Sequence, residues 1–257
     1  MKKYLKTISG RGAAKFLPQC RYRNCILILA HMRCGSTALS NILCSRAEVR
    51  GYGEAHIRYD GRDALGRLVV NQTLRSGRSL GALYLFDKIL HSRYDEDAPA
   101  EFFDARAIFV ARSPKPAIRS IRKLFAGLGN REYETDTDAA EYYLERLNRL
   151  MVLWQKFPAH RRIGLTHLDL LSDPQAQLNR ISARLEIHPR LENHYVSVAA
   201  SRKGGGGDPT TSGRYTRIEP QEGTMLSADR IVLNIAPELE IAVEEAYARF
   251  VHLTSDA

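Results

Sequence analysis

Residues 25–43, CILILAHMRCGSTALSNIL, join an apolar run, a short polar loop and a segment with helical spacing. The run Cys25–Ala30 is continuously apolar, which is typical of a parallel strand buried on both faces. Leu39, Ile42 and Leu43 then recur on one face of a helix. Backbone N–H groups at the start of such a helix attract anions. The stretch therefore predicts an α/β fold with an anion-binding loop between its first strand and the next helix.

The loop has the outline of the Walker A pattern G-x-x-x-x-G-K-[ST] but lacks its lysine. Ala30 stands at the first glycine, Gly35 at the second, Ser36 at the lysine and Thr37 at the hydroxyl position. Arg33 adds a further donor. An isolated Gly-Ser-Thr is also compatible with an ordinary turn, but the strand before it and the helix after it favour anion binding. One phosphate or sulfate group fits these residues better than a magnesium-bound triphosphate.

The rest of the chain alternates strands and helices. We expect strands at residues 49–52, 80–86, 107–111 and 162–168. The region before Ser79 is polar and poorly periodic. We expect one helix that begins at Pro114, one over residues 138–157, one that begins after Ser172-Asp173-Pro174 and one around residues 239–250. This alternation predicts a three-layer αβα fold with a mainly parallel central sheet. Ligands of such sheets bind at the carboxyl ends of the strands.

Composition favours one domain. The chain has 257 residues, 44% of them hydrophobic, and a formal charge of +9. Residues 1–24 hold seven basic and no acidic residues, so we expect a basic, flexible arm followed by a single domain over 25–257. The four cysteines suit neither a disulfide framework nor a metal site. With no apolar run long enough for a signal peptide or a transmembrane helix, we expect a cytoplasmic protein.

Three motifs resemble those of sulfotransferases that use 3′-phosphoadenosine 5′-phosphosulfate (PAPS). The first, [KR]-x-G-[ST]-T, is matched by Arg33-Cys34-Gly35-Ser36-Thr37. In the second, an arginine at a strand end is followed eight residues later by a serine, as are Arg112 and Ser120. The third, R-K-G-x-x-G-D, is matched by Arg202-Lys203-Gly204-Gly205-Gly206-Gly207-Asp208.

The resemblance implies how PAPS, and its product 3′-phosphoadenosine 5′-phosphate (PAP), would be bound. Residues 33–37 would hold the 5′-phosphosulfate, and Arg112 with Ser120 would hold the 3′-phosphate. Arg202, Lys203 and Gly204 would lie in a loop that closes over the 3′-phosphate and the adenine. No metal is expected, because PAPS already carries its leaving group.

Sulfuryl transfer needs in-line positioning, stabilisation of the leaving phosphate and removal of the acceptor proton. We assign the stabilisation to Arg33, the loop amides and Thr37, with support from Lys88. Glu54 and His56 compete for the role of general base. Glu54 is favoured because Gly53-Glu54 resembles a pair found in bacterial and carbohydrate sulfotransferases, although it could instead be a structural carboxylate.

Two other interpretations stay open at this point. In a kinase that uses ATP and Mg²⁺, Asp87 at the end of an apolar strand would bind the metal together with Thr37, but Ser36 replaces the required lysine. A non-enzymatic anion-binding or nucleic-acid-binding module would depend on the basic arm, which lacks interleaved aromatic residues. We therefore expect no nucleic-acid partner. We expect a hydroxyl-bearing acceptor, a carbohydrate or a natural product, in a pocket lined by residues 54–80 and 126–142.

Overall fold

A parallel sheet forms the centre of the molecule. The computed structural model describes residues 10, 12–61, 63–76, 82–197, 214–220 and 231–255. Within them, five strands run parallel in the order β2-β3-β1-β4-β5. They are β1 (Cys25–Ala30), β2 (Val49–Arg50), β3 (Tyr84–Ile89), β4 (Arg106–Ala111) and β5 (Arg162–Thr166). The parallel sheet predicted from the sequence is confirmed.

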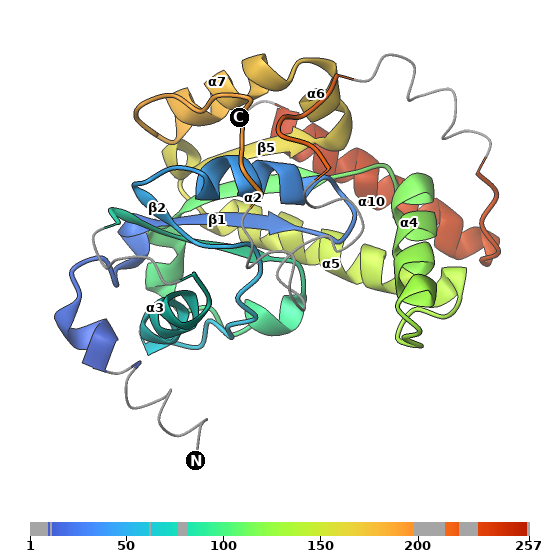
Figure 1. Ribbon diagram of the computed structural model, residues 1–257. Coiled ribbons are helices and arrows are strands. Elements are labelled where there is room, and N and C mark those ends of the chain that lie inside the picture. The colour runs from blue at the N-terminus through green and yellow to red at the C-terminus, as the bar shows by residue number, and fades with distance from the viewer. Residues whose placement is uncertain are drawn as a thin grey trace.

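Helices cover both faces of this sheet, which gives the predicted three layers. Figure 1 shows α2 and α7 on one face and α5 on the other, and α10 packs on α5 and on β5. The α-helices are α2 (Ser36–Cys44), α3 (Asp63–Ser76), α4 (Pro114–Gly127), α5 (Asp136–Lys156), α6 (His167–Ser172), α7 (Pro174–Arg184) and α10 (Pro237–Ser255). The short 3-10 helices are η1 (Tyr22–Asn24), η2 (Ser92–Tyr94), η3 (Ala100–Asp104) and η4 (Ala159–Arg161).

Strand β1 lies in the middle of the sheet, and all six of its residues are completely buried. It pairs with β3 on one side and with β4 on the other. Leu29 is level with Ile89, and Ala30 is level with Val110. Because these parallel strands end together, the segments that follow them meet at one edge of the sheet.

The region before Ser79 contains a helix that the sequence analysis did not predict. Its buried residues Ala64, Leu65, Leu68 and Val69 do follow helical spacing. Gln72 occupies the next buried position, where its side-chain amide donates to the carbonyl of Phe86 at 2.8 Å. A polar residue in the buried stripe, together with exposed charged neighbours, weakens the periodic signal.

Several strand boundaries differ from the expectation: β2 ends at Arg50 instead of residue 52, and β3 begins at Tyr84 instead of residue 80. β3 continues through Asp87 and Lys88, because both charged side chains find partners inside the fold. β5 ends at Thr166, so the predicted continuation to residue 168 is wrong. The Thr166 side chain accepts from the N–H of Asp169 at 3.0 Å, and Asp169 accepts from the N–H of Thr166 at 2.9 Å. This capping box starts α6 at His167.

Part of the amino-terminal segment packs on the domain. Ala14, Cys20 and Tyr22 are buried. Gly10 and Gly66 lie so close that a Cβ on Gly66 would fall 1.7 Å from the Gly10 carbonyl oxygen. The division at residue 24 stays a prediction. Within the described ranges, no helix combines the length and the apolar character needed to cross a membrane.

Candidate active site

The loop between β1 and α2 is shaped by two residues with positive φ. Arg33 has φ 64°, and Gly35, the N-cap of α2, has φ 86°. Gly35 is required for a second reason, because a Cβ there would lie 2.8 Å from Cδ2 of His167. No side chain caps the start of α2. Its first N–H groups are therefore available to an anion.

Arg33 contacts the second motif. Its Nε donates to Oγ of Ser120 at 2.9 Å, and Nη1 of Arg112 donates to the backbone carbonyl of Arg33 at 3.3 Å. Burial, together with the nearby charge of Arg33, lowers the pKa of Arg112. Two guanidinium groups and a hydroxyl thus gather at the ends of β1 and β4. A bound phosphate would relieve the repulsion between the two cations.

The backbone of Arg112 is held from both sides. His31 Nε2 accepts its N–H at 2.9 Å, and the hydroxyl of Tyr143 donates to its carbonyl at 2.8 Å. His31 Nδ1 lies 2.7 Å from the carbonyl of Met32, which fixes the proton on Nδ1. Burial lowers the pKa of His31 to about 3, so the ring is neutral near pH 7. His31 and Tyr143 carried no motif, and the sequence analysis did not find them.

Lys88 connects the loop with the candidate general base. Its Nζ donates to Oγ1 of Thr37 at 3.2 Å and lies 3.3 Å from Oε1 of Glu54. The Lys88 side chain is 1% exposed, and that of Glu54 is 14% exposed. Arg33, by contrast, reaches toward Ser120. Lys88 is therefore the cation that the structure places beside both Thr37 and Glu54.

His56 completes this cluster. Its Nε2 lies 3.5 Å from Oε2 of Glu54. The residue has φ 53°, an uncommon backbone conformation for any residue other than glycine. Burial lowers its pKa. The two candidate bases thus occupy one site, with Glu54 between Lys88 and His56.

Asp87 supports the segment that carries Glu54. One carboxylate oxygen accepts from the N–H of Ala55 at 2.8 Å, and the other accepts from the hydroxyl of Tyr59 at 2.7 Å. The backbone N–H of Lys88 donates to the carbonyl of Gly53 at 3.2 Å. Burial raises the pKa of Asp87 to about 7. Both oxygens of Asp87 are thus engaged by the segment that follows β2.

The remaining candidates divide into two groups. Cys34 lies in the loop and Ser36 is the first residue of α2; both are buried, and burial raises the pKa of the Cys34 thiol. Arg202, Lys203 and Gly204 lie outside the described residues. Among the residues described, no group of three or more His, Cys, Asp or Glu side chains could hold a metal ion.

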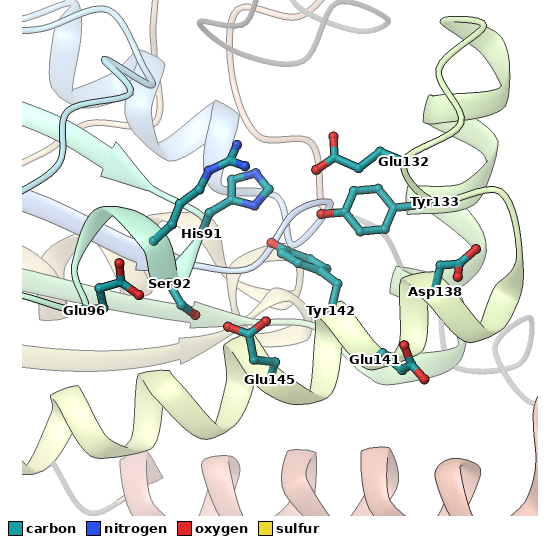
Figure 2. Close-up of a pocket in the computed structure, with 10 residues that line it drawn as sticks. His91, Ser92, Glu96, Glu132, Tyr133, Asp138, Glu141, Tyr142 and Glu145 are labelled. Carbon is teal, nitrogen blue, oxygen red and sulfur yellow. The ribbon is translucent and has the colours of Figure 1, made fainter.

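A cavity of about 610 Å³ lies beside the loop. Its wall includes Tyr142, whose hydroxyl accepts the N–H of Met32 at 2.9 Å and donates to the carbonyl of Leu90 at 2.7 Å. Figure 2 shows that η2 and the first turns of α5 contribute to the lining. The lining residues are His91, Ser92, Arg93, Glu96, Glu132, Tyr133, Asp138, Glu141, Tyr142 and Glu145.

The sequence and the fold are both similar to those of known proteins. Residues 62–190, just over half of the chain, match the model of the sulfotransferase family. No curated protein matches the chain. The sulfotransferase domain from the curacin biosynthetic pathway superposes with a TM-score of 0.60 at 17% identity, covering 87% of this chain and 96% of that domain.

Two further structures show the same fold. The sulfotransferase domain of the Synechococcus PCC 7002 olefin synthase gives a TM-score of 0.55 at 19% identity, over 90% of this chain and 97% of that one. Mouse sulfotransferase SULT7A1 complexed with PAP gives a TM-score of 0.51 at 13% identity, over 96% of this chain and 90% of that one. The matched sequence and the αβα architecture lead to one conclusion: this chain belongs to the sulfotransferase family.

Proposed function

We propose that the protein transfers a sulfuryl group from PAPS to a hydroxyl group of an acceptor. The observation that carries this proposal is the contact of Arg33 with both Arg112 and Ser120. Arg33 and Ser120 are 87 residues apart in the sequence. Two guanidinium groups and a hydroxyl suit a phosphate dianion. The solved complex of mouse SULT7A1 with PAP supports a ligand of this kind.

The described residues fit a ligand with two anionic ends. One end would bind at Arg33, Arg112 and Ser120, which we assign to the 3′-phosphate. The other would bind at the start of α2, where Thr37 and Lys88 lie 3.2 Å apart. Arg202, Lys203 and Gly204 remain proposed ligands of the 3′-phosphate and the adenine. PAPS supplies the sulfuryl group already joined to its phosphate leaving group.

We assign the main electrostatic role at the leaving phosphate to Lys88, the α2 amides and Thr37, whereas the Arg33 side chain is bound to Ser120 at the proposed 3′-phosphate end. As the S–O bond to the phosphate breaks, these groups stabilise the negative charge that develops on the released oxygen. The acceptor oxygen forms the new S–O bond and gives up its proton. The loop and Lys88 position the two reacting groups, so the protein need not form a covalent intermediate.

Glu54 is the proposed general base. Its carboxylate lies between Lys88 and His56, at 3.3 and 3.5 Å, and would take the proton of the acceptor hydroxyl. Asp87 and Tyr59 hold the segment that presents it. His56, whose pKa is lowered by burial, is the alternative base.

An ATP-dependent kinase that uses Thr37, Asp87 and Mg²⁺ is the alternative function. It is disfavoured because both oxygens of Asp87 serve Ala55 and Tyr59, and because Thr37 accepts from Lys88. Calorimetric titration with PAP and with ATP, each with and without Mg²⁺, separates the two functions. We expect micromolar binding of PAP without metal. Preference for Mg-ATP would overturn the proposal.

Transfer itself is measured with ³⁵S-labelled PAPS and a panel of hydroxyl compounds that includes sugars and phenols. We propose a carbohydrate or a natural product as acceptor. Glu54→Gln should reduce kcat by about 10²–10⁴-fold, with PAP affinity unchanged. His56→Gln is the matched control. A larger loss in His56→Gln than in Glu54→Gln would assign the base to His56 instead.

A further inference from the structure

We propose that the acceptor carries a positively charged nitrogen group, which binds in the cavity between η2 and α5 while the acceptor hydroxyl faces Glu54. This inference rests on the proposed sulfuryl transfer and names the class of acceptor. Amino sugars, aminated natural products and phenolic amines belong to this class. The argument uses the position, the charge and the aromatic lining of the cavity.

The cavity is a direct neighbour of the transfer site. The Tyr142 hydroxyl, on its wall, binds the N–H of Met32, which precedes Arg33. On the other side, the ring of Tyr94 lies 5.7 Å from that of His56 and 6.2 Å from that of His91. The Tyr142 side chain thus separates the cavity from Met32, and the ring of Tyr94 connects the lining residue His91 with His56.

The lining is strongly acidic, although the whole chain is basic. Five carboxylates and one guanidinium, that of Arg93, line the cavity. Burial lowers the pKa of His91 to about 4, so this ring adds no positive charge near pH 7. Figure 2 shows Glu132, Asp138, Glu141 and Glu145 around Tyr133 and Tyr142, and Glu96 farther away beside Ser92. An anionic acceptor would be repelled from this space, and a cationic one attracted.

Not all of these carboxylates are explained by contacts within the protein. Asp138 belongs to the capping box of α5, and Glu96 pairs with Arg58 at 3.1 Å. Glu141 and Glu145 form no ion pair with any described residue. They lie four residues apart on α5, and like charges at this spacing repel each other on a helix. A cation in the cavity would offset that repulsion.

The other side chains of the cavity also suit a cation. The Tyr142 ring lies 5.3 Å from the ring of Tyr133 and 5.3 Å from that of His91. Aromatic faces attract ammonium groups through their quadrupoles. Ser92 Oγ, on the same wall, is buried and has no hydrogen-bond partner in the described part of the chain. The lining thus combines aromatic faces, carboxylates and one unused hydroxyl.

The test uses pairs of compounds in which acetylation of the nitrogen removes its positive charge. Tyramine and N-acetyltyramine, and glucosamine and N-acetylglucosamine, are titrated into the PAP-loaded protein by calorimetry. The same four compounds are then offered as acceptors with ³⁵S-labelled PAPS. We expect at least one amine to bind and to react with a kcat/KM at least tenfold above that of its acetylated partner.

The double variant Glu141→Gln/Glu145→Gln should reduce this preference to about twofold, mainly through a higher KM. Its matched control, Glu238→Gln/Glu245→Gln, removes two exposed carboxylates from α10 and should keep the preference. The inference is overturned if neither amine binds, if an acetylated partner is used equally well, or if the preference survives in the first variant. PAP binding in the same samples reports separately on the proposed function.

Discussion

The ammonium of Lys88 lies 3.3 Å from the carboxylate of Glu54 while it donates to Thr37 at 3.2 Å. A cation and a proposed base, from different segments of the chain, are therefore joined at the start of α2. Lys88→Met should lower kcat about 10²–10³-fold, as removal of one transition-state donor does elsewhere. Turnover of labelled PAPS measures the loss. Lys88→Arg retains the charge and should recover part of the rate; equal losses in both variants would speak against an electrostatic role.

Arg112 and Ser120 should contribute unequally to PAP affinity. Arg112→Ala removes a charged donor and should raise the Kd of PAP about 10–100-fold, because hydrogen bonds to charged groups are worth about 1.5–3 kcal/mol. Ser120→Ala removes a neutral donor and should raise Kd less than tenfold. Calorimetry of both variants checks the order. Unchanged affinity in Arg112→Ala would remove this residue from the proposed phosphate site.

Gly35→Ala should destabilise the protein by about 1–3 kcal/mol, because Gly35 combines a φ of 86° with a close approach to His167. His167→Ala opens that space. The double variant should therefore be destabilised by less than the sum of the two single variants. The part of the destabilisation that comes from the positive φ at residue 35 should remain. Urea unfolding gives the free energies of unfolding of the wild type, the two single variants and the double variant. Strict additivity would show that the contact with His167 contributes nothing.

His31 should make the protein less stable in acid. Its pKa is about 3 in the folded protein, against 6.5 as its ordinary value. Below pH 6.5 the unfolded chain binds a proton that the folded ring does not, so the free energy of unfolding falls with decreasing pH. The limiting slope is about 1.4 kcal/mol per pH unit. In His31→Gln this contribution is absent.

Urea unfolding of the wild type and of His31→Gln at pH 7 and pH 5 isolates the effect. The stability difference between the two proteins should shrink by about 2 kcal/mol at the lower pH. The other histidines titrate in both proteins and cancel. A difference that does not change with pH would mean that buried His31 is not the group responsible.

The loop between β1 and α2 could be predicted from the sequence because its signals are local. An apolar strand, a glycine and a helical stripe follow one another within residues 25–43. Helix α3 was missed because Gln72, a buried polar residue bound to Phe86, interrupts its stripe. The end of β3 was placed too early because charge was taken to end an apolar run, whereas Asp87 and Lys88 have partners inside the fold.

Other parts of the site depend on contacts between distant segments. The bond between Arg33, in the loop after β1, and Ser120, on α4, joins segments 87 residues apart, so no local pattern in the sequence predicts it. The support that His31 and Tyr143 give to Arg112 follows from packing of α5 on the sheet. The acidic cavity likewise forms only when η2 and α5 come together.

The neighbours Asp87 and Lys88 have a consequence for how the protein folds. Adjacent residues of a strand point to opposite faces, so one serves Tyr59 and the other serves Thr37. If β3 paired with β1 one residue out of step, a carboxylate would replace the ammonium beside the loop between β1 and α2. Such a misfolded chain would carry a negative charge where we propose that the native chain binds an anion. An immobilised bisphosphate would then retain the molecules whose strands are correctly aligned. Affinity for this ligand would separate them from the misfolded molecules of a refolding mixture.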